Sequence, residues 1–119
     1  MVKYLFFCML LSLNLYAADA PQTTDAKWQG DVLNSKGVVV VDFNAGWCSP
    51  CRKMSPIMDK IFSETHANMF KLNVDINNCT SDKYGVHNIP CFIIFKDGVE
   101  VKRRYGSCSE ETMKEFIKN

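Results

Sequence analysis

The fold is decided by the stretch VVVVDFNAGWCSPC, residues 38–51. It opens on four valines followed by Asp42 and Phe43, a continuous run typical of a strand that is covered on both faces in a parallel sheet. It ends on Cys48 and Cys51, and the apolar residues that follow recur at the spacing of one helix face. Those residues are Met54, Ile57, Met58, Ile61 and Phe62. We therefore predict a central strand, a turn, and a helix that starts at the cysteine pair.

The flanking sequence extends this unit into a layered α/β domain. The other expected elements are a short helix around Trp28 to Leu33, a strand over 70–76, a short helix over 80–84, a strand over 91–95, its antiparallel partner over 99–105 and a last helix after Ser109. Asp97-Gly98 is a typical hairpin turn between the last two strands. We expect a central mixed sheet of four or five strands, flanked by helices on both faces.

Composition and charge fit one globular domain behind an export signal. Of the 119 residues, 47% are hydrophobic and 23% charged, which excludes a disordered or fibrous chain. The net charge of +1 lacks the basic surplus of a nucleic-acid-binding protein. Lys3, the apolar stretch 4–13 and the small residues that follow predict a signal peptide over 1–18 and a mature domain over 19–119. The alternative, a retained membrane anchor, fits less well because a span needs about 20 apolar residues.

The cysteine count agrees with an oxidising compartment. Loss of the signal removes Cys8 and leaves an odd number of cysteines, so at least one thiol is unpaired or only transiently paired. The chain does not end in a retention tetrapeptide of the endoplasmic reticulum. We expect the domain in the periplasm or outside the cell.

The pair Cys48 and Cys51 carries the expected chemistry. A thiol at a helix start meets free backbone N–H groups and the positive end of the helix dipole, which lowers its pKa from about 8.5 to about 3.5–7.5. Cys48 is therefore the expected nucleophile. Cys51, one turn along and further inside, would resolve the mixed disulfide.

A static disulfide and half of a zinc site are the alternatives for this pair. The other cysteines of the mature chain are scattered singly, and both histidines are isolated. Zinc sites need a second close pair of ligands, so we expect no metal.

Two neighbours of the pair are further candidates. Asp42 is costly to bury as an anion, so its pKa should rise and it could exchange protons with Cys51; the alternative is a strand-end acid that faces solvent. Trp47 is interpreted as an exposed rim beside Cys48, with simple core packing as the alternative.

From about Thr24 to Lys118 the chain resembles the thioredoxin family. The residues that carry the resemblance are Val41-Asp42-Phe43, Ala45, Trp47-Cys48-Ser49-Pro50-Cys51, Pro56, Lys71-Leu72-Asn73-Val74-Asp75, Lys83-Tyr84-Gly85-Val86, Ile89-Pro90, Phe95-Lys96-Asp97-Gly98 and Gly106. Separate motifs agree in order and spacing, and most of them do not depend on the cysteines.

The resemblance implies further roles for individual residues. Asp42 would exchange protons with Cys51, and Lys71 would tune it. Pro90 would be a cis-proline, and the backbone of Ile89 would pair with an incoming peptide. The remaining assignments are Trp47 and Gly106 beside Ile89 as an apolar substrate rim, Ser49 and Pro50 as the dipeptide between the cysteines, and Pro56 as a structural proline that bends the helix.

The chain departs from the family pattern at several positions. Asn44 stands where many thioredoxins carry an aromatic residue, and Ser49 replaces the usual glycine, so the redox potential cannot be read from the sequence. Residues 19–23 lack the alternation of the family's first strand, which is expected to be short or absent. Cys91 and Cys108 fall in neighbouring segments and are candidates for a second disulfide; the alternative is independent small residues.

The sequence thus predicts a thiol-disulfide oxidoreductase that acts on exported proteins without a cofactor, more as a reductant than as an oxidant. The alternatives are a disulfide donor or isomerase of the same compartment and a non-catalytic binding module. The expected partners are thiol- or disulfide-containing proteins and an electron donor or acceptor, such as a reductase or a membrane thiol carrier. A monomer is expected.

Overall fold

The computed structural model describes residues 18–118. The predicted signal peptide lies outside the described residues except for Ala18. The elements are the π-helical segment η3 (Gln29–Leu33), β1 (Val38–Asn44), α1 (Ser49–Thr65), β2 (Met69–Asn73), α2 (Asn78–Lys83), β3 (Cys91–Lys96), β4 (Val99–Tyr105) and α3 (Glu110–Lys118). Within 18–118, no helix combines the length and the apolar character that crossing a bilayer demands.

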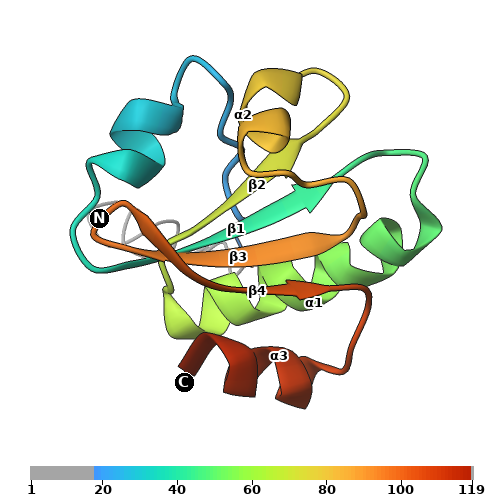
Figure 1. The fold of residues 1–119 in the computed structure, drawn as a ribbon. Helices are drawn as coiled ribbons and strands as arrows, with labels where there is room; N and C mark the ends of the chain where they lie inside the picture. The colour runs from blue at the N-terminus through green and yellow to red at the C-terminus, as the bar shows by residue number, and fades with distance from the viewer. Residues whose placement is uncertain (1–17, 119) are drawn as a thin grey trace, which may run out of the picture.

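The four strands form one mixed sheet in the order β2-β1-β3-β4. β2 runs parallel to β1, while β3 is antiparallel to both β1 and β4. Helix α1 connects the two parallel strands, so the predicted strand-helix-strand unit is confirmed (Figure 1).

A fifth strand is reduced to a single bridge at the β2 edge. Gln22 pairs with Lys71, and the Lys71 backbone exchanges hydrogen bonds of 2.8 Å with Pro21 and Thr23 on either side. Pro21 has no N–H to donate, which limits the ladder that this segment can build. The expectation of a short or absent first strand is confirmed.

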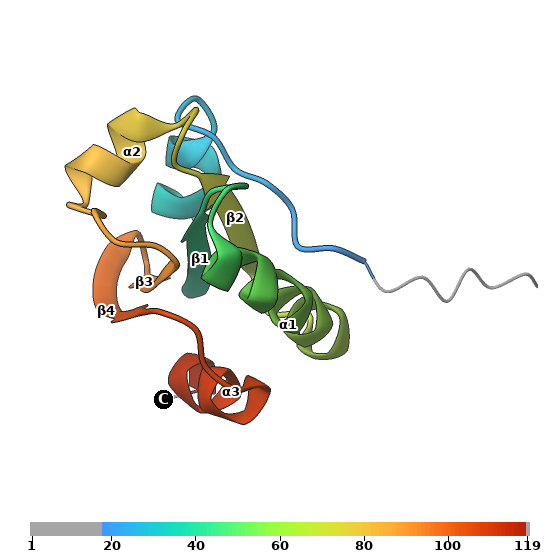
Figure 2. The ribbon, with the colours of Figure 1, turned by 90° about the vertical axis from the view of Figure 1, so that its right-hand side faces the viewer.

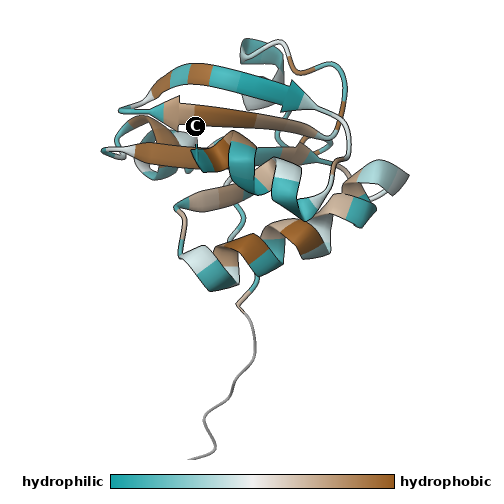
Figure 3. Cartoon of the chain, turned by 90° about the horizontal axis from the view of Figure 1, so that it is seen from below, coloured by the Kyte–Doolittle hydropathy of each residue, from teal (hydrophilic) through white to brown (hydrophobic). Residues whose placement is uncertain are grey.

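Helices cover both faces of the sheet, as predicted. α1 and α3 lie on one face, and η3 and α2 lie on the other (Figures 1 and 2). Because strand side chains alternate, Val39 and Val41 pack with Trp28 of the η3 face, whereas Val40 packs with Met54 of α1. All of these side chains are buried, and Figure 3 shows the apolar inner strands beside the largely polar edge strand β4.

Strand β2 ends at Asn73, earlier than the alternation to Ile76 predicts. The side-chain oxygen of Asn73 accepts the backbone N–H of Asp75 at 2.9 Å, which turns the chain out of the sheet. The residues Val74 to Ile76 therefore form a turn rather than the end of a strand.

The hairpin between β3 and β4 needs its glycine. Asp97 and Gly98 have φ of 51° and 80°, the positive values that a tight hairpin turn requires. A side chain at Gly98 would also collide with the backbone of Leu33. The absence of a side chain at Gly98 therefore lets the end of η3 lie against this turn.

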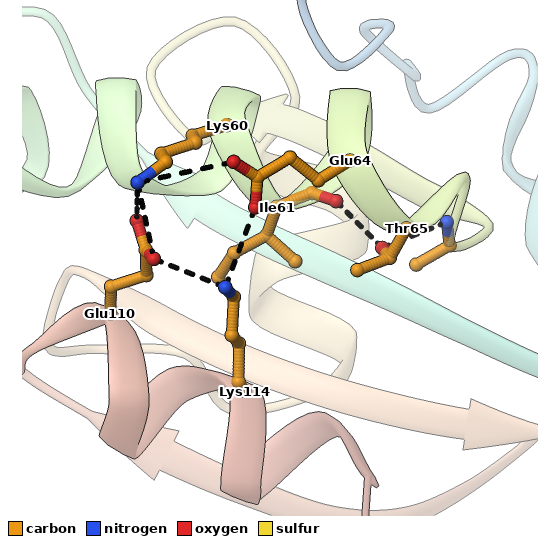
Figure 4. Close-up of polar contacts among 7 residues, drawn as sticks. Lys60, Ile61, Glu64, Thr65, Glu110 and Lys114 are labelled. Atoms are coloured by element: carbon orange, nitrogen blue, oxygen red, sulfur yellow. Dashed lines mark hydrogen bonds and ion pairs between the residues drawn. The ribbon is translucent and has the colours of Figure 1, made fainter.

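Charged side chains join α1 to α3 near the end of α1. Glu110 accepts from Lys60 at 2.9 Å and from Lys114 at 3.1 Å, and Lys114 lies 3.4 Å from Glu64 (Figure 4). Exposed ion pairs contribute about 0–1 kcal/mol each. The buried contact between the helices, from Met58 and Ile61 to Met113, carries more of the stability.

Candidate active site

The reactive pair is held at the first turn of α1. Cys48 is the N-cap residue of this helix and is joined to Cys51 by a disulfide, with Cα atoms 5.2 Å apart. The backbone N–H of Cys51 points at Cys48 Sγ at 3.2 Å. Pro50 lies in the first turn, where a missing N–H costs no helical hydrogen bond. The predicted placement of the pair at a helix start is confirmed, and the Cys48 sulfur meets the amide dipoles that stabilise an anion there.

Both cysteines are buried. Cys48 is 4% exposed and Cys51 is 5% exposed, so residue exposure does not distinguish them, and the greater depth of Cys51 stays a prediction. Val74 and Ile89 pack over the pair, and the Cys48 sulfur lies 3.8 Å from the carbonyl oxygen of Ile89. The loop that contains Ile89 therefore covers Cys48 at the N-terminus of α1.

That loop contains the proline expected from the resemblance. The peptide bond between Ile89 and Pro90 is cis, and the Pro90 carbonyl accepts the N–H of Gly106 at 2.9 Å. The structure therefore brings Cys48, Ile89, Pro90 and Gly106 into one place, although they come from α1 and from the two ends of the β3-β4 hairpin.

Trp47 lies on the surface beside the disulfide. It is 69% exposed, so the alternative of a core tryptophan is wrong. Its indole Nε1 donates to both carboxylate oxygens of Asp75, at 3.0 and 3.3 Å. Ile76, the next residue, is 77% exposed. Sequence reasoning missed Asp75 as a neighbour of the site because it assigned this residue to a strand; Asn73, a turn-forming residue two positions before Asp75, was the available signal.

Asp42 is buried behind the pair. It is 2% exposed, which excludes the alternative of a solvent-facing acid, and its Oδ1 has no hydrogen-bond partner among the described residues. Burial raises the pKa of this carboxyl to about 7; the positive charge of Lys71 opposes that rise, and the negative charge of Asp59 adds to it. The group therefore changes its charge near neutral pH.

A small cavity lies between Asp42 and Cys51. It has a volume of about 170 Å³, and both Asp42 and Cys51 line it. Asn44, at the position where many thioredoxins carry an aromatic residue, lines it too and donates from its amide to the Asp42 backbone carbonyl at 3.0 Å. The buried acid and Cys51 thus face the same cavity.

Lys71 faces the same cavity but is bonded elsewhere. It stands opposite Asp42 in the parallel register of β1 and β2. Its Nζ lies 2.7 Å from Asp59 and donates to Ser55 at 2.8 Å. Sequence reasoning missed Ser55 and Asp59; their spacing of four residues on one helix face was the only signal.

The remaining candidates are Pro56 and the cysteines outside the pair. Pro56 lies inside α1, which continues past it. Cys91 and Cys108 are free thiols, so the candidate second disulfide is wrong. Cys91 packs into the η3 face of the sheet and Cys108 into the α1 face, and the sheet separates them. Cys79 is free and exposed. Within residues 18–118, no cluster of three or more potential ligand side chains could hold a metal ion.

Comparisons with known proteins agree with this geometry. A family model described as Thioredoxin matches residues 19–119. The chain is 36% identical over 103 residues to "Thioredoxin C-2" of Corynebacterium nephridii, covering 85% of this chain and 95% of that protein. It is 38% identical over 96 residues to "Thioredoxin" of Pseudomonas aeruginosa (79% and 89% covered) and 41% identical over 95 residues to "Thioredoxin" of Synechocystis sp. (78% and 89% covered).

Proposed function

The chain belongs to the thioredoxin family, and on that premise we propose that it reduces disulfides of exported proteins, with Cys48 as the nucleophile and Cys51 as the resolving thiol. Its coarser activity follows from the family and the disulfide: it is a dithiol-disulfide oxidoreductase that acts on thiol or disulfide proteins and needs no cofactor. The single observation that carries the assignment of roles is the Cys48 sulfur at the N-terminus of α1, facing the N–H of Cys51.

The reaction proceeds by two exchanges of sulfur bonds. In the first, the Cys48 thiolate attacks one sulfur of the substrate disulfide, forms a mixed disulfide and expels the other substrate sulfur as a thiolate. In the second, Cys51 loses its proton to the Asp42 carboxylate and attacks Cys48 Sγ, which releases the remaining substrate thiolate. The substrate gains two electrons, and the enzyme is left with the disulfide between Cys48 and Cys51.

Asp42 suits the second exchange for two reasons. Its carboxyl and Cys51 line the same cavity, and its pKa of about 7 lets it accept and release a proton near neutral pH. Lys71 limits the rise of that pKa through its nearby charge.

The substrate rests on the surface that surrounds Cys48. Trp47, Ile89, Pro90 and Gly106 form its apolar rim, and the Ile89 backbone pairs with an extended segment of the substrate. Ile76 extends the rim beyond Trp47, because it follows Asp75, which binds the indole, and its side chain is exposed. An unfolded or extended protein segment fits such a surface better than a small polar molecule does.

Insulin reduction tests the catalytic proposal. The reduced protein should cleave insulin disulfides, and a Cys51→Ser variant should accumulate a mixed disulfide through Cys48. A Cys48→Ser variant that keeps full insulin-reducing activity would exclude these roles, and so would a Cys51→Ser variant that traps no mixed disulfide.

A titration against glutathione tests the direction of electron flow. Known potentials of the fold run from about −270 mV for reductants to about −120 mV for oxidants. A value near the first supports the reductant, and a value near the second supports a disulfide donor instead.

Export and monomeric action complete the proposal. Lys3 and the apolar stretch 4–13 support a cleaved signal, which would release the domain into the periplasm or the medium. Fractionation of cells that express the full chain, followed by mass measurement of the product, tests this. A product that stays in the cytoplasm with residues 1–18 attached would overturn it, and a dimer in size-exclusion chromatography would overturn the monomer.

A further inference from the structure

The Lys71 ammonium is held by helix α1 and not by the acid that it faces in the sheet. Its Nζ lies 2.7 Å from Asp59 and 2.8 Å from Ser55, whereas Asp42 Oδ1 has no hydrogen-bond partner within the described chain. A lysine beside a buried carboxylate would ordinarily pair with it, since an unpaired buried charge is costly. Here, Asp59 and Ser55 of α1 bind the lysine instead.

Asp59 is itself fixed in place. Its Oδ1 accepts the backbone N–H of Ala20 at 3.0 Å, and in the same segment Pro21 and Thr23 hydrogen-bond the Lys71 backbone on either side of the Gln22 bridge. Asp59 therefore contacts Lys71 directly and is tied to the segment that pairs with the Lys71 backbone. The Lys71 side chain is 9% exposed and that of Asp59 is 21% exposed, so water screens this pair only in part.

We propose that Asp59, together with Ser55, is a positioning residue that fixes the Lys71 ammonium against α1 and so keeps it from closing an ion pair with Asp42. The inference deepens the proposed function, because it rests on Asp42 as the proton acceptor of Cys51. With the lysine held back, the Asp42 carboxylate is basic enough to accept a proton near neutral pH; a direct ion pair would make it a much weaker base.

Arg52 and Arg104 are two other cationic residues near this part of the sheet. Arg52 of α1 lines the cavity together with Asp42, Lys71 and Cys51, and it donates to the Gly46 carbonyl at 2.9 Å. Across the sheet, Arg104 of β4 lies beyond Phe92, which is the partner of Asp42 in β3. None of these provides Asp42 with a hydrogen bond, so Lys71 is the cation whose position matters most for it.

The test is a carboxyl titration of Asp42 followed by ¹³C NMR in the oxidised protein, where Cys51 does not titrate. In Asp59→Asn, the amide still accepts from Ala20 but no longer attracts the ammonium. We expect the Asp42 midpoint to fall by about one pH unit, because the raising effect of the Asp59 charge is lost and the freed cation approaches the carboxylate. Asp59→Glu should return the midpoint toward that of the wild type.

The matched control is Glu64→Gln. It removes one carboxylate from the same helix, but Glu64 faces Lys60 and Lys114 rather than the cavity (Figure 4). We expect no change in the Asp42 midpoint. An Asp59→Asn midpoint that equals the wild type, or that rises, would overturn the proposal.

Ser55→Ala separates the position of Lys71 from the direct effect of the Asp59 charge, because Ser55 holds the ammonium but carries no charge, and it also serves if Asp59→Asn does not fold. It keeps the ion pair and removes one hydrogen bond, so the midpoint should fall by a smaller amount; an unchanged midpoint would then overturn the proposal. Because the titration needs no turnover, a failure here is distinct from a failure of the insulin assay.

Discussion

Cys48 and Cys91 show how strongly position controls the chemistry of one residue type. Cys48 caps α1 and meets the N–H of Cys51 at 3.2 Å, so the helix stabilises its anion. Cys91 begins β3 directly after Pro90 and is fully buried among apolar side chains. Burial raises the pKa of the Cys91 thiol to about 11. Two cysteines that border the same cis-proline loop are therefore expected to differ completely in reactivity.

Cys48→Ser should produce the largest effect. Serine cannot form the mixed disulfide, so insulin reduction should fall to the uncatalysed rate, a loss on the order of a thousandfold or more. The assay is insulin precipitation with dithiothreitol as electron source. Turnover above the background in this variant would show that another thiol does the work.

Asp42→Asn should change both rate and stability. The buried carboxyl holds its proton up to about pH 7, whereas the unfolded chain releases it near 3.8, so ionisation above about pH 4 favours unfolding. The folded state should therefore lose stability as pH rises through that window, by roughly 4 kcal/mol in full. Asparagine escapes this loss, and the variant should be more stable than the wild type at pH 8 and no more stable below pH 4.

Denaturant unfolding as a function of pH measures that difference in the free energy of unfolding. A stability difference that does not vary with pH would contradict the buried, neutral acid.

The same substitution should slow the resolving step by about a hundredfold, because Cys51 loses its proton acceptor.

Ile76→Gln should have a moderate and selective effect. If Ile76 extends the substrate surface, kcat/KM for insulin should fall about threefold to tenfold from lost apolar contact. Activity on a small aromatic disulfide should not change. Val99→Gln is the matched control, since Val99 is also exposed but lies on the edge strand β4. Equal losses in both variants would remove Ile76 from the substrate surface.

Cys91→Ala should have the smallest effect on activity. The change leaves a small cavity in the core and should cost about 1–2 kcal/mol in the free energy of unfolding, with insulin reduction unchanged. Cys79→Ala, at an exposed position, should be neutral in both measurements. A variant at Cys91 that folds but loses activity would show that Cys91, too, takes part in the reaction.

Local patterns predicted most of the fold. The valine run and the helical spacing after Cys51 identified β1 and α1, and the Asp97-Gly98 turn identified the last hairpin. The end of β2 was misjudged because the alternation continues past Asn73, whose side chain turns the chain. A strand pattern carries no information about such a local hydrogen bond.

The site was predicted less completely than the fold. The pair at the helix start and the burial of Asp42 follow from the residues themselves. The cis bond before Pro90 came only from the resemblance, since most X-Pro bonds are trans. The pairing of Lys71 with Asp59 depends on how α1 packs on β2, which the sequence does not show. The same reason explains the wrong disulfide: neighbouring segments can present two cysteines to opposite faces of the sheet.

The most direct test of the account is the rate at which iodoacetamide alkylates each cysteine of the reduced, folded protein at pH 7, resolved by peptide mass mapping. Cys48 should react faster than a thiol in a short unstructured peptide, and Cys91 should stay unmodified until the protein unfolds. A Cys48 thiol no more reactive than the free peptide would contradict the claim that the first turn of α1 stabilises its anion.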